Sequence, residues 1–310
     1  MKNSLTQLLK NPYIIAYVVL YILLLVLLRT VEGFDLTEPI LIFLIVGVGF
    51  SALAWWVTKG VTPLPFSIKQ PASECRLLAI YLLVVTVFVT WGLGIIERTF
   101  GTEPLKSVFL LTAKLIVVVI VPLGLFHWLW RYRLRGFINV SSGWSGHRRV
   151  TLWMSLALIL FQLVFGQGVS EIRRAGLGGW SLVIGIPFAY VWLIVEVGLV
   201  EEFFFRALLQ SRLAALFQSE TAGIVLMALL FGLAHAPGLY FRTAKTMEAI
   251  SPSPSWLMAI GYSIVVTSVT GFFLGILWAR TKNLPVLMLI HAAGDLVPNL
   301  IHMLQAWRMV

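Results

Sequence analysis

Two adjacent glutamates, Glu201 and Glu202, lie inside a long apolar run from Trp180 to Phe217, and Arg206 follows one helical turn after the second. A charged side chain at the depth of the hydrocarbon core costs about 2.5–3.5 kcal/mol on insertion scales, so such residues usually mark a site or a pathway. Two neighbouring carboxylates in a low dielectric cannot both ionise cheaply, so one is expected to keep a proton or to take a cationic partner. Arg206 is the expected partner, because it is at i+4 from Glu202.

Two later apolar segments also carry polar groups that can do acid–base chemistry. His235 follows Phe231 at i+4, and Asp295 follows His291 at i+4, so each pair shares one helix face. A carboxylate beside a neutral imidazole can take a proton from water, and a second imidazole with a neutral acid can stabilise a developing oxyanion. The set therefore predicts a water-activating hydrolytic site.

A single site requires that these groups lie at one depth in the membrane. If 201–217 and 219–235 are the arms of a helical hairpin that turns near Gln218, Glu201 and His235 are each seventeen residues from residue 218. At a common rise per residue they are then level. The sequence therefore predicts that Glu201 and His235 lie at the same depth on the two arms.

Basic residues at predicted cytoplasmic helix ends give a second measure of depth. Glu202 is ten residues from Arg212, and His291 is nine residues from Lys282. Each separation corresponds to about 14–15 Å at 1.5 Å per residue, which is near the middle of a core of about 30 Å. We therefore expect a site near mid-membrane that is reached from the cytoplasmic side.

The order of these motifs is similar to that of a known protease family. Glu-Glu-x-x-x-Arg, Phe-x-x-x-His and His-x-x-x-Asp/Asn on consecutive apolar segments resemble the CAAX-processing and bacteriocin-processing intramembrane proteases, whose eukaryotic members cleave prenylated CAAX proteins. The resemblance covers about 180–300, and three motifs in order are a far stronger signal than any one of them. It implies an intramembrane endopeptidase of the type 2 CAAX prenyl protease kind.

The resemblance also implies a role for each residue. Either Glu201 or Glu202 is then the general base, Arg206 fixes the glutamates and His235 helps to hold the water. His291 with Asp295 forms the oxyanion side. Many family members have Asn at the last position, which donates a hydrogen bond readily, whereas Asp295 donates only when it is protonated.

Other kinds of function remain open for the same residues. Two Glu, two His and one Asp could supply ligands for zinc in a zinc-dependent membrane protease, but the chain lacks His-Glu-x-x-His, so no cofactor is expected and zinc is not indicated. A proton-coupled transporter also uses chains of Glu, His and Asp, but it usually carries inverted repeats, and none is visible here. A non-catalytic membrane scaffold would tolerate loss of Glu201 and Glu202.

Composition places the chain among integral membrane proteins. It is 59% hydrophobic and 12% charged, about half the charged fraction of an ordinary soluble domain. The net charge of +10 does not indicate nucleic-acid binding, because the basic residues lie in short loops between apolar runs, where they orient a membrane protein. The single cysteine, Cys75, excludes an intrachain disulfide.

The apolar runs predict an all-α, polytopic transmembrane helical bundle with eight or nine membrane elements. The run at 181–217 is too long for one perpendicular crossing, and Pro187 can kink it. The runs are at about 12–28, 39–57, 77–96, 107–130, 150–166, 181–217, 221–235, 256–279 and 284–304.

The distribution of basic residues predicts the orientation. With the N-terminus in the cytoplasm, the inner segments carry 14 of the 23 Lys and Arg residues and the outer segments 8, with Lys114 inside a span. This asymmetry favours a multi-pass protein of the cell membrane with a cytoplasmic N-terminus. The compact loops favour a prokaryotic chain. Its expected partners are the lipid bilayer and a membrane-associated protein or peptide substrate, and the sequence does not indicate an oligomeric state.

We expect residues 1–179 to form N-terminal transmembrane helices of unknown role, and residues 180–305 to form a CAAX protease-like catalytic membrane domain. Glu196 precedes the motif by five residues and points to another helix face, so we expect it to pair with another helix. Lys114 is expected to snorkel or to pair with a carboxylate. Gly271 and Gly275 offer a small face for close helix packing.

Overall fold

The structure, a computed structural model, describes residues 10–137, 144–177, 179–241 and 254–309, and the elements in these ranges are helices. Within them, nine helical spans are long and apolar enough to cross a membrane. This confirms the all-α polytopic bundle and agrees with the higher of the two predicted counts. The spans are Pro12–Glu32, Thr37–Val57, Pro71–Thr99, Leu105–Trp130, Gly146–Phe165, Gly179–Leu216, Glu220–Phe241, Trp256–Thr281 and Leu284–Ala306.

Several spans change between α-helical and π-helical geometry along their length. The α-helices are α2 (Pro12–Glu32), α3 (Thr37–Ile42), α4 (Ser51–Val57), α5 (Pro71–Val87), α6 (Leu93–Thr99), α7 (Leu105–Lys114), α8 (Val121–Trp130), α9 (Trp144–Phe165), α10 (Gly168–Arg174), α11 (Gly179–Leu193), α12 (Ser211–Leu216), α13 (Glu220–Phe241), α14 (Trp256–Tyr262), α15 (Ser268–Thr281) and α16 (Leu284–Ala306). The π-helical stretches are η1 (Phe43–Phe50), η2 (Phe88–Gly92), η3 (Leu115–Ile120), η5 (Ile194–Leu199), η6 (Glu202–Gln210) and η7 (Ser263–Thr267), and η4 (Leu134–Gly136) is a short 3₁₀ turn. Glu202 and Arg206 lie on η6, and such stretches often occur at functional sites.

The start of α16 shows how local sequence fixes a helix that carries candidate site residues. The side chain of Asn283 accepts a hydrogen bond from the backbone N–H of Val286 at 3.3 Å, which caps the helix. Pro285 lies in the first turn, where its missing N–H costs nothing. His291 and Asp295 therefore lie well inside a helix whose beginning is fixed by its own residues.

The chain folds into two compact units that interleave along the sequence. Unit 1 comprises Met1–Leu53, Ile68–Thr90 and Leu208–Ala279, and unit 2 comprises Ala54–Ser67, Trp91–Ala207 and Arg280–Val310. Each unit thus combines early and late segments of the chain. The predicted division at residue 179 concerns function and stays a prediction.

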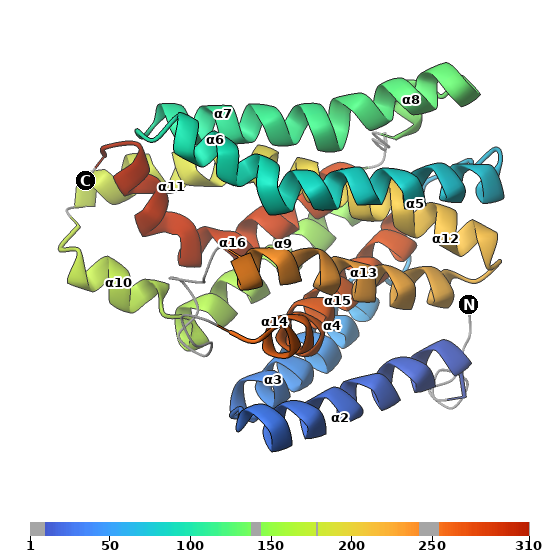
Figure 1. Cartoon of the computed structure of the whole chain (residues 1–310), viewed down its shortest axis with the longest axis horizontal. Helices are drawn as coiled ribbons and strands as arrows, with labels where there is room; N and C mark the ends of the chain where they lie inside the picture. Colours follow the sequence, from blue (N-terminus) through green and yellow to red (C-terminus); the bar gives the residue numbers. More distant parts are fainter. Residues whose placement is uncertain (1–9, 138–143, 178, 242–253, 310) are drawn as a thin grey trace. The chain divides into compact units, whose positions relative to one another are not determined.

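Unit 1 contains the turn of the predicted helical hairpin. α12 ends at Leu216, Gln218 has a left-handed φ of 49°, and α13 begins at Glu220 (Figure 1). The side chain of Ser219 accepts a hydrogen bond from the N–H of Ala222 at 3.2 Å and so caps the second arm. The arms are close, since a Cβ added at Gly223 would lie 2.7 Å from the Cβ of Ala214. The turn near Gln218 is confirmed.

Close packing at the predicted glycine pair is also confirmed. A Cβ added at Gly271 would lie 3.1 Å from the Cα of Ala228, and one at Gly275 would lie 3.2 Å from the side chains of Gln210 and Ile224. The side-chain amide of Gln210 donates to the carbonyl of Gly275 at 2.8 Å. The two glycines therefore let α15 approach α13 and the end of η6 within unit 1.

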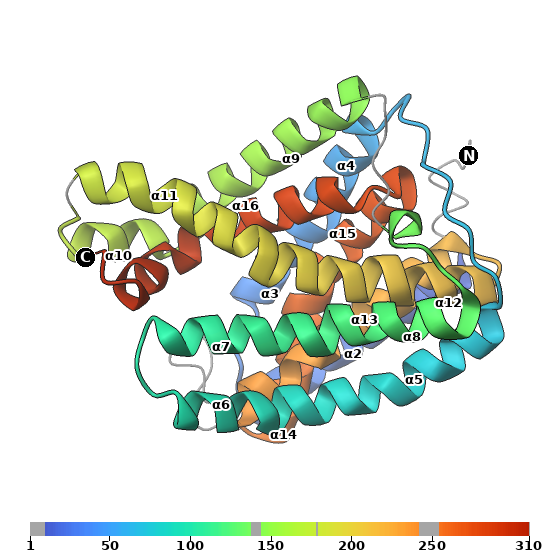
Figure 2. The same ribbon diagram turned by 90° about the horizontal axis from the view of Figure 1, so that it is seen from above.

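Unit 2 is built around α16, which packs against α9, α10, α11 and η5 (Figure 1). Its core joins the small and apolar residues Ala189 and Leu193 of α11 to Ala292, Leu296 and Leu300 of α16. α6 and α7 form a separate neighbouring pair in this unit (Figure 2). α16 therefore has a fixed position against the span that carries Glu201 and Glu202.

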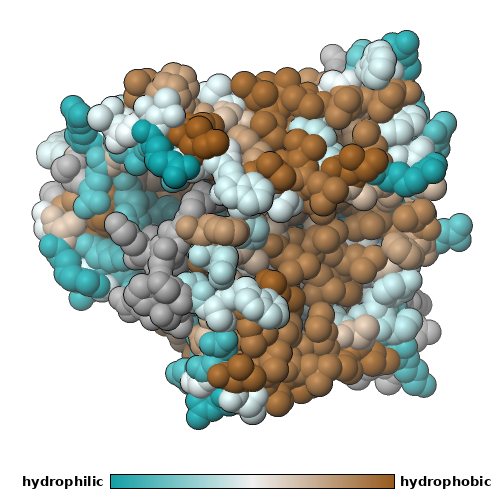
Figure 3. All heavy atoms as spheres, viewed as in Figure 1, coloured by the Kyte–Doolittle hydropathy of each residue, from teal (hydrophilic) through white to brown (hydrophobic). Residues whose placement is uncertain are grey.

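The surface is apolar where a membrane helix would meet lipid. Leu23, Leu83 and Val164, from three different spans, are each more than 60% exposed. Figure 3 shows apolar residues across much of the viewed face, with hydrophilic residues toward its left and right margins. Exposed apolar surface on this scale indicates contact with lipid rather than with water. Three of the basic residues counted for the orientation, Lys2, Arg242 and Lys245, lie outside the described residues.

Candidate functional site

A short hydrogen bond between Glu202 and His291 is the centre of the candidate site in unit 2. Glu202 Oε1 lies 2.6 Å from His291 Nδ1, and the glutamate side chain is fully buried while the histidine side chain is 8% exposed. A carboxylate only accepts, so Nδ1 carries the proton and donates it. This bond fixes the imidazole and directs its other nitrogen, Nε2, away from Glu202.

Two partly exposed acids lie on the other side of the imidazole. His291 Nε2 is 4.0 Å from Glu201 Oε2 and 3.8 Å from Asp295 Oδ2. These distances exceed a direct hydrogen bond, but one water can bridge groups so separated. The side chains of Glu201 and Asp295 are 26% and 34% exposed, whereas Glu202 is sealed from solvent. The imidazole therefore separates a buried carboxylate from two accessible ones.

Arg206 lies beside the buried glutamate, as its spacing predicts. Its Nε is 3.4 Å from Glu202 Oε2, and both side chains are fully buried. A buried carboxylate needs such compensation, because its desolvation is otherwise very costly. Glu202 is thus held from one side by a guanidinium and from the other by an imidazole.

His235 belongs to unit 1, and its predicted approach to the glutamates stays a prediction. Its Nδ1 lies 2.8 Å from the carbonyl of Phe231, and the two rings are 4.8 Å apart between centroids, so the shared helix face is confirmed. A carbonyl only accepts, so Nδ1 carries the proton. In the neutral ring Nε2 is then an acceptor for a water hydrogen.

Lys114 and Glu196, the two charged residues that lie outside the motifs, form an ion pair in unit 2. Lys114 Nζ lies 2.9 Å from Glu196 Oε1, and the indole N–H of Trp192 donates to Glu196 Oε2 at 2.5 Å. Both predictions are confirmed: Glu196 pairs with another helix, and Lys114 pairs with a carboxylate. This cluster ties α7 to the span that carries the candidate site.

Sequence reasoning missed a buried ion pair in unit 1. Arg212 Nε lies 2.9 Å from Glu74 Oε2, and both side chains are fully buried. The other Glu74 oxygen accepts from the backbone N–H of Gln70 at 2.9 Å. Glu74 lies at the start of an apolar helix, far from Arg212 in the sequence. Nothing in the residue spacing links the two side chains, and only the folded structure identifies the pair.

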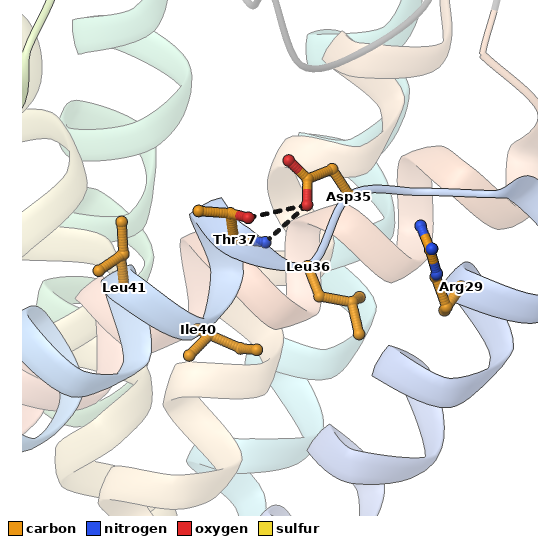
Figure 4. A pocket seen from close by; sticks show the side chains of 6 residues that line it. All are labelled: Arg29, Asp35, Leu36, Thr37, Ile40 and Leu41. Atoms are coloured by element: carbon orange, nitrogen blue, oxygen red, sulfur yellow. Dashed lines mark hydrogen bonds between the residues drawn. The ribbon is translucent and has the colours of Figure 1, made fainter.

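An open pocket of about 510 Å³ lies in unit 1, between α2 and α3, and it carries none of the predicted site residues (Figure 4). Arg29 and Asp35 line it together with apolar side chains. Asp35 accepts hydrogen bonds from the backbone N–H and the hydroxyl of Thr37, and these lower the pKa of its carboxyl group. No imidazole lines the pocket, so we do not place the chemistry there.

The six predicted residues fall inside a single family match. Residues 180–297 match the model described as type II CAAX prenyl endopeptidase Rce1-like. This part of the chain is therefore similar to the Rce1-like family. No curated protein and no solved structure gives a significant match to the chain. The Rce1-like segment indicates a peptidase that acts in the membrane on a membrane-associated substrate.

The Rce1-like segment supplies every group of the arrangement in unit 2. Glu201, Glu202 and Arg206 come from one span, and His291 and Asp295 come from α16. Among the residues that the structure describes, no three His, Cys, Asp or Glu side chains are grouped so as to hold a metal ion. The predicted independence of metal stays a prediction.

Proposed function

We propose that the chain is an intramembrane endopeptidase in which Glu201 activates a water molecule and His291 with Asp295 stabilises the oxyanion. The observation that carries this proposal is the 2.6 Å hydrogen bond from His291 Nδ1 to the buried Glu202, which aims Nε2 between Glu201 and Asp295. An aimed donor beside an accessible carboxylate is the arrangement that peptide hydrolysis needs.

Solvent access divides the work between the two glutamates. Glu201 is 26% exposed, so a water molecule can reach its carboxylate, whereas Glu202 is fully buried and is engaged by Arg206 and His291. Glu201 is therefore the general base. It takes a proton from water, the hydroxide adds to the scissile carbonyl carbon, and the proton passes to the leaving amine.

Glu202 and Arg206 position the histidine rather than touch the reacting atoms. The carboxylate is anchored by the guanidinium at 3.4 Å and holds Nδ1 at 2.6 Å. A preorganised group loses no energy to reorientation when charge develops. Glu202 also stabilises the imidazolium form of His291, in which both ring nitrogens donate hydrogen bonds.

Asp295 completes the oxyanion side. Its Oδ2 lies 3.8 Å from His291 Nε2, on the same face of α16. A protonated carboxyl group donates one hydrogen bond to the same oxygen that Nε2–H binds. The family pattern with Asn at this position indicates a donor as well, and His235, through its acceptor Nε2, is proposed to hold the attacking water.

The proposed substrate is a lipidated or otherwise membrane-anchored protein whose scissile bond reaches the active site from the cytoplasmic side. The match to a CAAX prenyl endopeptidase family supports a substrate whose chain ends near a lipid-bearing residue. The asymmetry of basic residues supports a proposed placement in the cell membrane with a cytoplasmic N-terminus.

The test uses purified protein in proteoliposomes and two fluorogenic peptides, one ending in a farnesylated CAAX sequence and one with the same sequence without the lipid. We expect cleavage of the farnesylated peptide, and Glu201→Gln should lower kcat by at least about a hundredfold, since an amide cannot take the proton. The variant should still bind and trap the intact peptide. Turnover by Glu201→Gln at the native rate would rule out this base.

A further inference from the structure

Gly198 lies in close contact with the backbone of α16, one turn before Glu202. A Cβ added at Gly198 would lie 2.6 Å from the carbonyl oxygen, 2.9 Å from the Cα and 3.1 Å from the carbonyl carbon of Met288. All three atoms belong to the backbone, which cannot move aside as a side-chain end can. Any larger residue at 198 must therefore push η5 and α16 apart.

The two helices run in opposite directions at this contact. Gly198 lies against Met288, and thirteen residues earlier Gly185 lies against Leu304, so residue numbers fall on one helix as they rise on the other. The Tyr190 hydroxyl donates to the carbonyl of Leu289 at 3.0 Å, beside the same contact. The crossing is therefore fixed by backbone contact and by a hydrogen bond.

The crossing lies between the two groups that form the central hydrogen bond. Glu202 is four residues after Gly198, and His291 is three residues after Met288. Side chains in an α-helix lean toward its N-terminus, so in this antiparallel pair both lean back toward the crossing, one from each side. The separation of the helices there decides whether Glu202 can reach His291.

We propose that Gly198 is a positioning residue, whose missing side chain sets the helix separation that lets Glu202 hold His291 Nδ1. The expected effect of Gly198 on turnover rests on the proposed function. Its expected effect on the hydrogen bond between Glu202 and His291 does not. Glu202 and His291 are already joined at 2.6 Å, and nearly half an ångström of added separation would take them to the outer edge of a strong hydrogen bond.

The chain offers two matched controls in unit 2. Gly185→Ala is on the same span, but the added Cβ meets only the side-chain end of Leu304, which can shift. Gly124→Ala is on α8, where an added Cβ has no atom within 4 Å. These variants share the general effect of replacing glycine by alanine in a helix, and they lack the backbone collision.

We expect Gly198→Ala to lower kcat by about tenfold or more with little change in KM, because a displacement of about 1 Å can cost a hundredfold in turnover and the expected displacement is about half of that. In protein labelled with ¹⁵N-histidine, the downfield Nδ1 proton of His291, assigned with His291→Gln, should be lost in Gly198→Ala. Gly185→Ala and Gly124→Ala should keep both kcat and this proton. A merely structural glycine would lower the melting temperature and leave the proton of the folded fraction in place.

Tyr190→Phe is a variant with a smaller expected structural effect, to be used if Gly198→Ala cannot be expressed as folded protein. It removes one hydrogen bond between the same helices and should weaken the same proton signal and lower kcat several-fold. Native kcat and a native His291 proton in Gly198→Ala, or in Tyr190→Phe if it alone can be purified, would overturn the proposal. The two proposals can also fail separately. If Gly198→Ala loses the His291 proton while Glu201→Gln stays active, the positioning role of Gly198 is supported and the catalytic use of the site is rejected.

Discussion

Two buried glutamate–arginine pairs in this molecule have similar chemistry and different surroundings. In unit 2, Glu202 pairs with Arg206 on the same span, and in unit 1, Glu74 pairs with Arg212 across two helices. All four side chains are fully buried. Burial of an ion pair is therefore not what distinguishes a candidate active site, because the same feature also joins helices.

The difference lies in what else each carboxylate touches. The second oxygen of Glu74 accepts from a backbone N–H, and Arg212 also donates to the backbone carbonyl of Leu208 at 3.4 Å. The second oxygen of Glu202 holds an imidazole, beyond which two accessible acids lie. A buried carboxylate that also holds a titratable ring can influence a reaction through that ring, and the observed contacts show this for Glu202.

The largest expected effect separates the two pairs by activity. Glu202→Gln and Glu74→Gln each remove a negative charge and keep an oxygen that accepts hydrogen bonds. Glu202→Gln should lower kcat at least about a hundredfold, because the amide does not stabilise imidazolium. Glu74→Gln should leave the kcat of the folded protein close to native. Peptide cleavage normalised to folded protein measures both, and equal losses in the two variants would erase the distinction.

The next effect separates the pairs by stability. Glu74→Leu leaves Arg212 buried without its carboxylate, and breaking a buried pair in this way costs about 3–5 kcal/mol. Replacing both partners, as Glu74→Leu with Arg212→Met, should restore most of that loss, since an apolar pair of similar volume needs no compensation. The unfolding free energy in a detergent titration measures this. A double variant as unstable as the single one would mean that the pair is not the source of the loss.

The sequence predicted the site of the first pair but not the second, and the reason is distance along the chain. Glu202 and Arg206 are four residues apart, so helical periodicity alone joins them. Glu74 and Arg212 are 138 residues apart, and periodicity says nothing about which helices become neighbours. The i, i+4 relation of His291 and Asp295 was predicted for the same local reason.

Features that depend on helix contact were beyond the sequence in the same way. The turn near Gln218 could be predicted because it lies between two consecutive apolar runs, but the backbone contact of Gly198 with Met288 needs the crossing of two distant spans. The π-helical stretch that carries Glu202 was not predicted either, because its i to i+5 bonding leaves no strong signature in residue spacing. The kind of chemistry could be predicted from residue types, but the distances between the reacting groups depend on how the helices pack.

The smallest expected effect is that of removing divalent cations. A bound cation would change how the Glu202–Arg206 pair differs from the Glu74–Arg212 pair. If Glu202 and His291 were metal ligands, their 2.6 Å contact would be replaced by bonds to the ion, and the comparison with Glu74 would be one of metal site against ion pair. Because Glu201 can take a proton from water without an ion, we expect exhaustive chelation to leave kcat unchanged. Elemental analysis of the purified protein should find zinc well below one ion per chain. Stoichiometric zinc, with activity lost on chelation and recovered on readdition, would establish a metalloprotease and assign Glu202 to the metal rather than to the orientation of His291.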